Sequence, residues 1–195
     1  MIPPDIIEVT LKVVQVFDRL GITYHVGGSL ASSSYGVARS TLDVDVVADI
    51  KPEQAEKIYM FLKEEFYADT EMIQDAVRRR SSFNLIHLET MFKVDVFILK
   101  DRPFDREGFS RRIQKTVSSE DPEKRLYFAS PEDTVLNKLE WYRKGGEVSD
   151  RQWNDVLGIL KVQAKDLDMD YMKKWAENLG LSHILSKALD EAGIS

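Results

Sequence analysis

The chain begins with apolar residues spaced three or four apart, as on one face of an amphipathic helix. This pattern runs over residues 6–20, and Gly21 then occupies the position where glycine commonly ends a helix. Two short segments, 22–26 and 41–47, are rich in β-branched residues, and the second alternates polar with apolar positions. Both segments predict strands. A Gly-Gly-Ser turn at 27–29 follows the first strand and leads into a short expected helix.

The middle of the chain alternates between helical and strand patterns. Pro52 suits the first turn of a helix whose apolar residues extend to Phe66, and a further helix is expected over 70–80. Short runs rich in β-branched and aromatic residues predict two strand pairs across polar connections. These pairs are 83–87 with 92–99, and 113–117 with 126–129.

From Ser130 onward only helical spacing is found. Ser130 and Ser149 each stand where a helix N-cap is expected, because a helix-starting pattern follows them directly. We expect four helices in this region. The patterns together predict an α+β domain over residues 1–129, with a helical C-terminal region, 130–195, packed on it.

Composition narrows the class of protein. The chain has 195 residues, with 27 Lys and Arg against 33 Asp and Glu, which gives a formal net charge of −6. This charge argues against general coating of nucleic acid, and leaves only local basic clusters such as 78–80 and 111–112. The absence of cysteine excludes disulfides, thiolate zinc sites and a cysteine nucleophile. Without a membrane-spanning apolar run or a signal-peptide pattern, we expect a cytoplasmic protein that does not enter membranes.

Two aspartates, Asp43 and Asp45, lie in the predicted strand 41–47. Residues two apart in a strand point to the same face, so the two carboxylates repel each other unless a cation lies between them. A third, Asp95, stands among apolar residues of another predicted strand, where a buried carboxylate needs a partner. That partner is either a shared metal ion or a basic side chain, unless the register of the strand turns Asp95 toward solvent. Oxygen ligands in a chain with no Cys and three His point to Mg²⁺ or Mn²⁺.

Other motifs receive simpler interpretations. A second acidic run, Asp166, Asp168 and Asp170, directly precedes a predicted helix, where acidic side chains interact favourably with the helix dipole. The 27–29 turn lies between a strand and a helix, where bare backbone amides suit phosphate oxygens. It matches neither the Walker A loop nor the Rossmann fingerprint. The tryptophans, Trp141 among them, occur at helical inward positions and are expected in the core.

These motifs together resemble the signature of the DNA polymerase beta-like nucleotidyltransferase superfamily. Val-Gly-Gly-Ser at 26–29 is followed by Asp-Val-Asp-Val at 43–46, and Asp95 falls where the third carboxylate of that superfamily is expected. The closer likeness is to a bacterial branch that includes the type IV abortive-infection toxin nucleotidyltransferases. It rests on the segments 35–41, 130–139 and 151–155. The resemblance implies a nucleotidyltransferase-like mixed sheet flanked by helices.

The resemblance also implies an activity. The enzyme would transfer a nucleoside monophosphate from a nucleoside triphosphate to a hydroxyl group and release pyrophosphate. Gly27, Gly28 and Ser29 would form the nucleotide-binding turn, with Gly28 and Ser29 on the β- and γ-phosphates. The metal ligands would be Asp43, Asp45 and Asp95, which would hold two Mg²⁺ ions, and Asp95 would help to deprotonate the attacking hydroxyl.

Three further residues enter by the same likeness. Lys138 would contact the triphosphate, Asp155 matches a position that bears on activity in the toxin branch, and Arg39 would reach a phosphate or brace the neighbouring strand. The alternative for all three is an ion-pair network that joins the helical tail to the first domain. His25, beside the glycine turn, is interpreted as a hydrogen-bonding residue at the edge of the core.

The sequence leaves the acceptor open among a tRNA end, a protein hydroxyl and a small molecule such as an antibiotic. Two alternatives to an active transferase also stay open. One is a nucleotide-binding or interaction module that keeps the fold without turnover. The other is the toxin component of a toxin–antitoxin pair, with an antitoxin protein as its partner.

Overall fold

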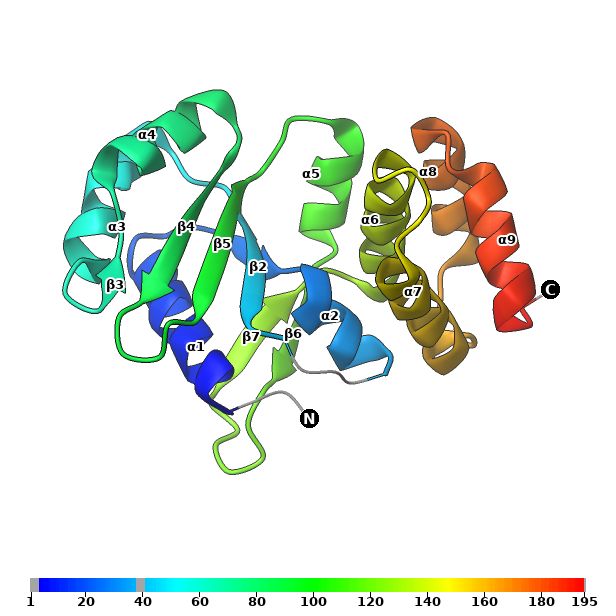
Figure 1. Ribbon diagram of the computed structural model, residues 1–195, viewed down its shortest axis with the longest axis horizontal. Coiled ribbons are helices and arrows are strands. Elements are labelled where there is room, and N and C mark those ends of the chain that lie inside the picture. Colours follow the sequence, from blue (N-terminus) through cyan, green and yellow to red (C-terminus); the bar gives the residue numbers. More distant parts are fainter. Residues whose placement is uncertain (1–3, 38–40, 195) are drawn as a thin grey trace.

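The computed structural model describes residues 4–37 and 41–194. Over these residues the fold is α+β, as predicted, with one seven-stranded mixed sheet flanked by helices (Figure 1). In spatial order the strands are β3 (Phe66–Tyr67), β4 (Ser82–His87), β5 (Lys93–Ile98), β2 (Asp43–Ala48), β1 (Tyr24–Val26), β7 (Arg125–Phe128) and β6 (Ile113–Thr116). The central strand β2 is parallel to β5 and antiparallel to β1.

The strands β2 and β5 have one fully buried face. Their even-numbered positions are apolar, and the valines among them are inaccessible to solvent. Tyr24 of β1 lies on this face and packs against Phe17 of the first helix, 6.2 Å between ring centroids. The helices on this side are α1 (Pro4–Arg19), α3 (Ala55–Leu62), preceded by the 3-10 turn η1 (Pro52–Gln54), and α4 (Thr70–Arg79). Because side chains alternate between the two faces of a strand, burial of this apolar face directs the odd-numbered side chains to the opposite face.

The odd-numbered positions of the two strands, Asp45 and Asp95 included, are only partly buried. The helices on their side are α2 (Gly28–Tyr35), α5 (Pro103–Ser110) and α6 (Pro131–Lys144), with α7 (Asp150–Gln163) packed on α2 and α6. The last helices, α8 (Met169–Leu179) and α9 (Ser182–Ala192), lie farthest from the sheet (Figure 1). All four helices expected after residue 130 are therefore present.

Two glycines let α7 approach α2 closely. A Cβ at Gly36 would lie 2.8 Å from the backbone carbon of Gly158, closer than real side chains come, and a Cβ at Gly158 would touch Val37. Next to this contact, the Gln163 side chain donates a hydrogen bond to the Tyr35 carbonyl (2.8 Å). The contact holds α7 against the helix that follows the glycine turn.

Two expectations for the middle of the chain need correction. The helix after Pro52 ends at Leu62, and Phe66 lies in β3, where its buried ring packs on His87. The sequence interpretation also missed α5, although Pro103 stands at its first turn and its phenylalanines are buried.

In the described part of the chain, none of the helices combines the length and apolar character needed to cross a bilayer.

The helices of the C-terminal region begin at side-chain caps. The Ser130 hydroxyl accepts a hydrogen bond from the Asp133 amide (3.1 Å), and the Ser149 hydroxyl accepts one from the Gln152 amide (3.4 Å). Asp168 caps α8 by accepting from the Tyr171 amide (2.9 Å), which agrees with the interpretation of its acidic run. Each cap satisfies a backbone donor that the helix itself leaves unpaired.

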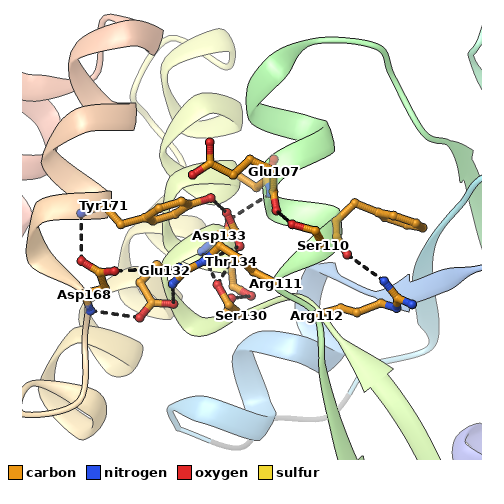
Figure 2. A network of polar contacts seen from close by, with 12 residues as sticks. Glu107, Ser110, Arg111, Arg112, Ser130, Glu132, Asp133, Thr134, Asp168 and Tyr171 are labelled. Atoms are coloured by element: carbon orange, nitrogen blue, oxygen red, sulfur yellow. Dashed lines mark hydrogen bonds and ion pairs between the residues drawn. The ribbon is translucent and has the colours of Figure 1, made fainter.

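A buried polar network joins the start of α6 to α8 and to the end of α5 (Figure 2). Asp133 accepts hydrogen bonds from the Tyr171 hydroxyl (2.6 Å) and the Ser130 hydroxyl (2.7 Å). The Arg111 guanidinium stacks over the Tyr171 ring, 3.9 Å from its centroid, and pairs with Glu132 at 3.3 Å. Burial raises the pKa of Asp133, so its ionised form depends on these donors.

We predict that Tyr171→Phe lowers the free energy of unfolding by about 1–3 kcal/mol, because the buried Asp133 loses its hydroxyl partner. Urea denaturation measures the change. The matched control is Tyr67→Phe, since Tyr67 is 60% exposed and its stability change should stay within about 0.5 kcal/mol. Equal effects of the two substitutions would contradict a stabilising role for this network.

Candidate active site

The glycine turn closes directly on one of the predicted aspartates. Gly28 has φ +53°, a conformation that favours glycine, and a Cβ there would overlap the Asp45 carboxylate, 2.6 Å from its Cγ. The Gly27 amide donates a hydrogen bond to the Asp45 carbonyl (2.8 Å). The N-terminus of α2, with Ser29 in its first turn, therefore lies against this carboxylate. Backbone amides and a helix N-terminus at one point are suited to bind phosphate.

The three predicted carboxylates share one face of the sheet. Asp45 stands directly opposite Asp95 in the parallel pairing of β2 with β5, and Asp43 precedes Asp45 by two residues on the same face. The Thr41 hydroxyl donates to Asp43 Oδ1 (2.7 Å), and the Lys93 ammonium lies 2.7 Å from Asp95 Oδ2. The basic partner considered for Asp95 is thus present.

Negative charge is incompletely compensated at Asp45. Burial, together with the nearby charges of Asp43 and Asp95, raises its pKa to about 6, although Lys138 and Lys93 act in the opposite direction. A carboxyl group with this pKa is only partly ionised at mildly acidic pH. An additional cation at this position would favour the ionised form.

The carboxylates are also the predicted metal ligands. Within residues 4–37 and 41–194, no group of three or more His, Asp or Glu side chains is placed to hold a metal ion. The Lys93 ammonium instead neutralises Asp95. The chemistry of the donors nevertheless suits an oxygen-ligated divalent ion, because the carboxylates lie on one face and one of them has a raised pKa. The three-aspartate metal site stays a prediction.

A cavity of about 450 Å³ lies between this sheet face and the helices α5, α6 and α7. It brings together six of the residues predicted from the sequence: Gly27, Gly28, Ser29, Asp45, Lys138 and Asp155. Its lining does not include Asp43 or Asp95, which lie beside it on β2 and β5. Arg39, the remaining predicted residue, lies outside the described part of the chain.

Two basic residues of the cavity, Lys138 and Arg151, are held by polar partners. The Lys138 ammonium pairs with Asp155 Oδ2 (2.8 Å), and both side chains are largely buried. This pair joins α6 to α7, whereas the ion-pair alternative placed it between the helical region and the first domain. A contact between α7 and α2 is made by Arg151, whose guanidinium donates to the Ser29 hydroxyl (3.1 Å).

Three cavity residues were missed or assigned another role. Arg151 precedes Asp155 by four residues, so both side chains lie on the same side of α7 and line the cavity. This helical spacing is the signal in the sequence that could have identified Arg151. Trp141, expected in the core, is 53% exposed and lines the cavity. His25 is buried against Phe109 with a pKa lowered to about 4, mainly by burial and also by Arg112. In the described part of the chain its Nδ1 has no hydrogen-bond partner.

Comparison with known proteins supports the fold. No protein-family model and no curated protein sequence matches this chain. An antigenic nucleotidyltransferase-like protein from Paracoccidioides brasiliensis has a similar structure, with 16% identity, a TM-score of 0.57 and coverage of 97% of this chain and 94% of that one. The antibiotic-resistance factor ANT(2'')-Ia is similar over 95% of each chain, with 11% identity and a TM-score of 0.54. The chain therefore has a nucleotidyltransferase-like fold over nearly its whole length.

We predict that Gly28→Ala destabilises the protein by about 1–3 kcal/mol more than Gly21→Ala. Both glycines have positive φ, so both substitutions carry backbone strain, but a Cβ at Gly21 meets nothing within 4 Å while one at Gly28 overlaps Asp45. Chemical denaturation of the two variants measures the difference. Equal losses would show that the turn does not press on the carboxylate.

A second prediction concerns the pH dependence of Asp45→Asn. The unfolded carboxyl group ionises near 3.8 and the folded one near 6, so wild-type stability falls as pH rises between these values. Without metal, in the presence of EDTA, the variant should therefore exceed the wild type in unfolding free energy by about 1–3 kcal/mol above pH 6, and by much less near pH 4.

The control for this pH series is Asp75→Asn. A hydrogen bond from Arg78 lowers the pKa of the exposed Asp75, so the stability that this residue contributes is present above the unfolded pKa and is lost at lower pH. Its pH dependence should have the opposite sign. A difference between wild type and Asp45→Asn that does not change from pH 4 to pH 8 would contradict the raised pKa.

Proposed function

We propose that this protein transfers a nucleoside monophosphate from a nucleoside triphosphate to a hydroxyl acceptor. The observation that carries the proposal is the close approach of the Gly28 turn to Asp45, with Asp95 directly opposite on the neighbouring parallel strand. This arrangement puts phosphate-binding amides and carboxylates at one point. Phosphoryl transfer depends mainly on positioning and on charge neutralisation, and the site offers groups for both.

The phosphate groups are bound at the N-terminus of α2. Its first-turn amides and the Ser29 hydroxyl donate to the β- and γ-phosphates, and the Lys138 and Arg151 side chains neutralise their charge. Both basic groups already lie at the cavity, because Asp155 holds Lys138 and Ser29 holds Arg151. Little side-chain reorganisation is then needed when the triphosphate binds.

The carboxylates provide the chemistry of the transfer. Asp43, Asp45 and Asp95 would hold Mg²⁺, which supplies charge neutralisation to the phosphates when bound. The acceptor oxygen attacks the α-phosphorus, the bond from this phosphorus to the bridging oxygen breaks, and pyrophosphate leaves. Asp95 accepts the proton of the acceptor hydroxyl, which requires its ion pair with Lys93 to rearrange.

The acceptor and the biological setting remain predictions. A tRNA end, a protein hydroxyl and a small molecule all fit the proposed reaction. A role as the toxin of a toxin–antitoxin pair rests on the sequence resemblance alone. A module that binds nucleotide without turnover is the competing function, and the Lys93–Asp95 ion pair favours it, since this contact occupies the proposed proton acceptor.

We expect Asp43→Asn to reduce nucleotidyl transfer by about a hundredfold or more, since one of the three carboxylates that would hold Mg²⁺ at the reacting phosphates is removed. Pyrophosphate release from each of the four ribonucleoside triphosphates, with Mg²⁺ and a total tRNA pool or a panel of hydroxyl compounds, measures the activity. Asp49→Asn is the matched control, because Asp49 follows the same strand but pairs with Lys51 and Arg106.

The outcomes separate the proposals. Pyrophosphate release by the wild type and by Asp49→Asn, but not by Asp43→Asn, supports the transferase. Full activity of Asp43→Asn would exclude the assigned site. Tight binding of Mg²⁺ and triphosphate by the wild type, without pyrophosphate release from any nucleotide, would favour the inactive module.

A further inference from the structure

The cavity extends along α6, beyond the residues assigned to phosphate. Lys138, Trp141 and Lys144 follow one another at intervals of three residues, so they lie along the same side of the helix, and all three line the cavity. Trp141 is 53% exposed, and the Lys144 ammonium lies 5.3 Å from the centroid of its ring. A large aromatic side chain is thus exposed one helical turn from the proposed phosphate contact.

Two other aromatic side chains that line this cavity, Phe104 and Phe109, are already packed, and Phe97 of β5 is partly buried. Phe104 lies against Trp175, 5.4 Å between ring centroids, and Phe109 lies against His25 at 5.2 Å. Phe104, Phe109 and Trp175 are all more than nine-tenths buried. Trp141 therefore differs from them, since its exposed ring surface is accessible to a ligand in the cavity.

The position of the carboxylates indicates which substrate the cavity holds. Asp45 lines it together with Ser29 and Lys138, whereas Asp95 and Lys93 do not. In the proposed reaction the acceptor hydroxyl must reach Asp95, so it approaches from outside the cavity. The cavity is then left to the nucleotide, whose phosphates lie at the α2 end.

We propose that Trp141 is the stacking platform for the nucleobase of the triphosphate substrate. This inference rests on the proposed function and assigns the base-binding part of the same site. Stacking uses the aromatic face that every base has, so the platform binds all four bases and favours the larger purines. Base preference would then depend on ring size more than on hydrogen-bonding pattern.

The test measures the affinity of the full chain for two probes by calorimetry, with Mg²⁺ present. One probe is α,β-methylene-ATP, whose α–β bridge is not cleaved, and the other is inorganic tripolyphosphate, which has no base. Trp141→Ala should weaken binding of the ATP analogue by about 5- to 150-fold and leave tripolyphosphate binding unchanged. Trp141→Phe should retain most of the affinity, because it keeps an aromatic face. Thermal denaturation checks that both variants remain folded.

Each outcome has a separate meaning. Unchanged affinity of Trp141→Ala for the ATP analogue, with normal wild-type binding, would overturn the platform and leave the proposed function intact. Equal weakening of both probes would also overturn it, since it would place Trp141 at the phosphates. Failure of the wild type to bind either probe would instead contradict the proposed function itself.

Discussion

The candidate site depends on the contact between the Gly28 backbone and the Asp45 side chain. Because Gly28 has no Cβ, the N-terminus of α2 comes close enough to a sheet carboxylate for backbone amides and the acid to lie at one point of the candidate site. With a larger distance between Gly28 and Asp45, the N-terminus of α2 and the carboxylates of the sheet would not form one site. The raised pKa of Asp45 is the electrostatic cost of this arrangement, which is typical of groups held in place for function.

The C-terminal helices contribute to the site because they pack on α2. The glycine contact between Gly36 and Gly158 fixes α7 against the end of α2, and α7 in turn presents Arg151 and Asp155 to the cavity. At the start of α6, the Asp133 network anchors the same group of helices to α5 (Figure 2). The basic side chains of the candidate site are therefore positioned by contacts between helices, and these contacts lie away from the carboxylates.

Much of this arrangement could be predicted from local signals. The strand with Asp43 and Asp45, the glycine turn and the capped starts at Ser130 and Ser149 depend on residues close together in sequence, and all are present. The sequence-based predictions were wrong where contacts between distant parts of the chain determine the structure. Phe66 continues a helical pattern but pairs as a strand with β4. Trp141 has helical inward spacing, yet it faces a cavity that only the packing of α6 on the sheet creates.

The parallel pairing of β2 with β5 has a consequence for folding. It aligns Asp45 with Asp95 across fifty positions of the chain, and such distant pairings form slowly. A slip of one residue would turn every carboxylate of one strand toward the apolar interior. The solvent-inaccessible valines on the opposite face disfavour this slip, because it would expose them. The packing that stabilises the sheet therefore also keeps the carboxylates on the side of the candidate site. Chains with a shifted register would be unstable and would also lack the candidate site, so the degradation of unstable chains would remove those without the site as well.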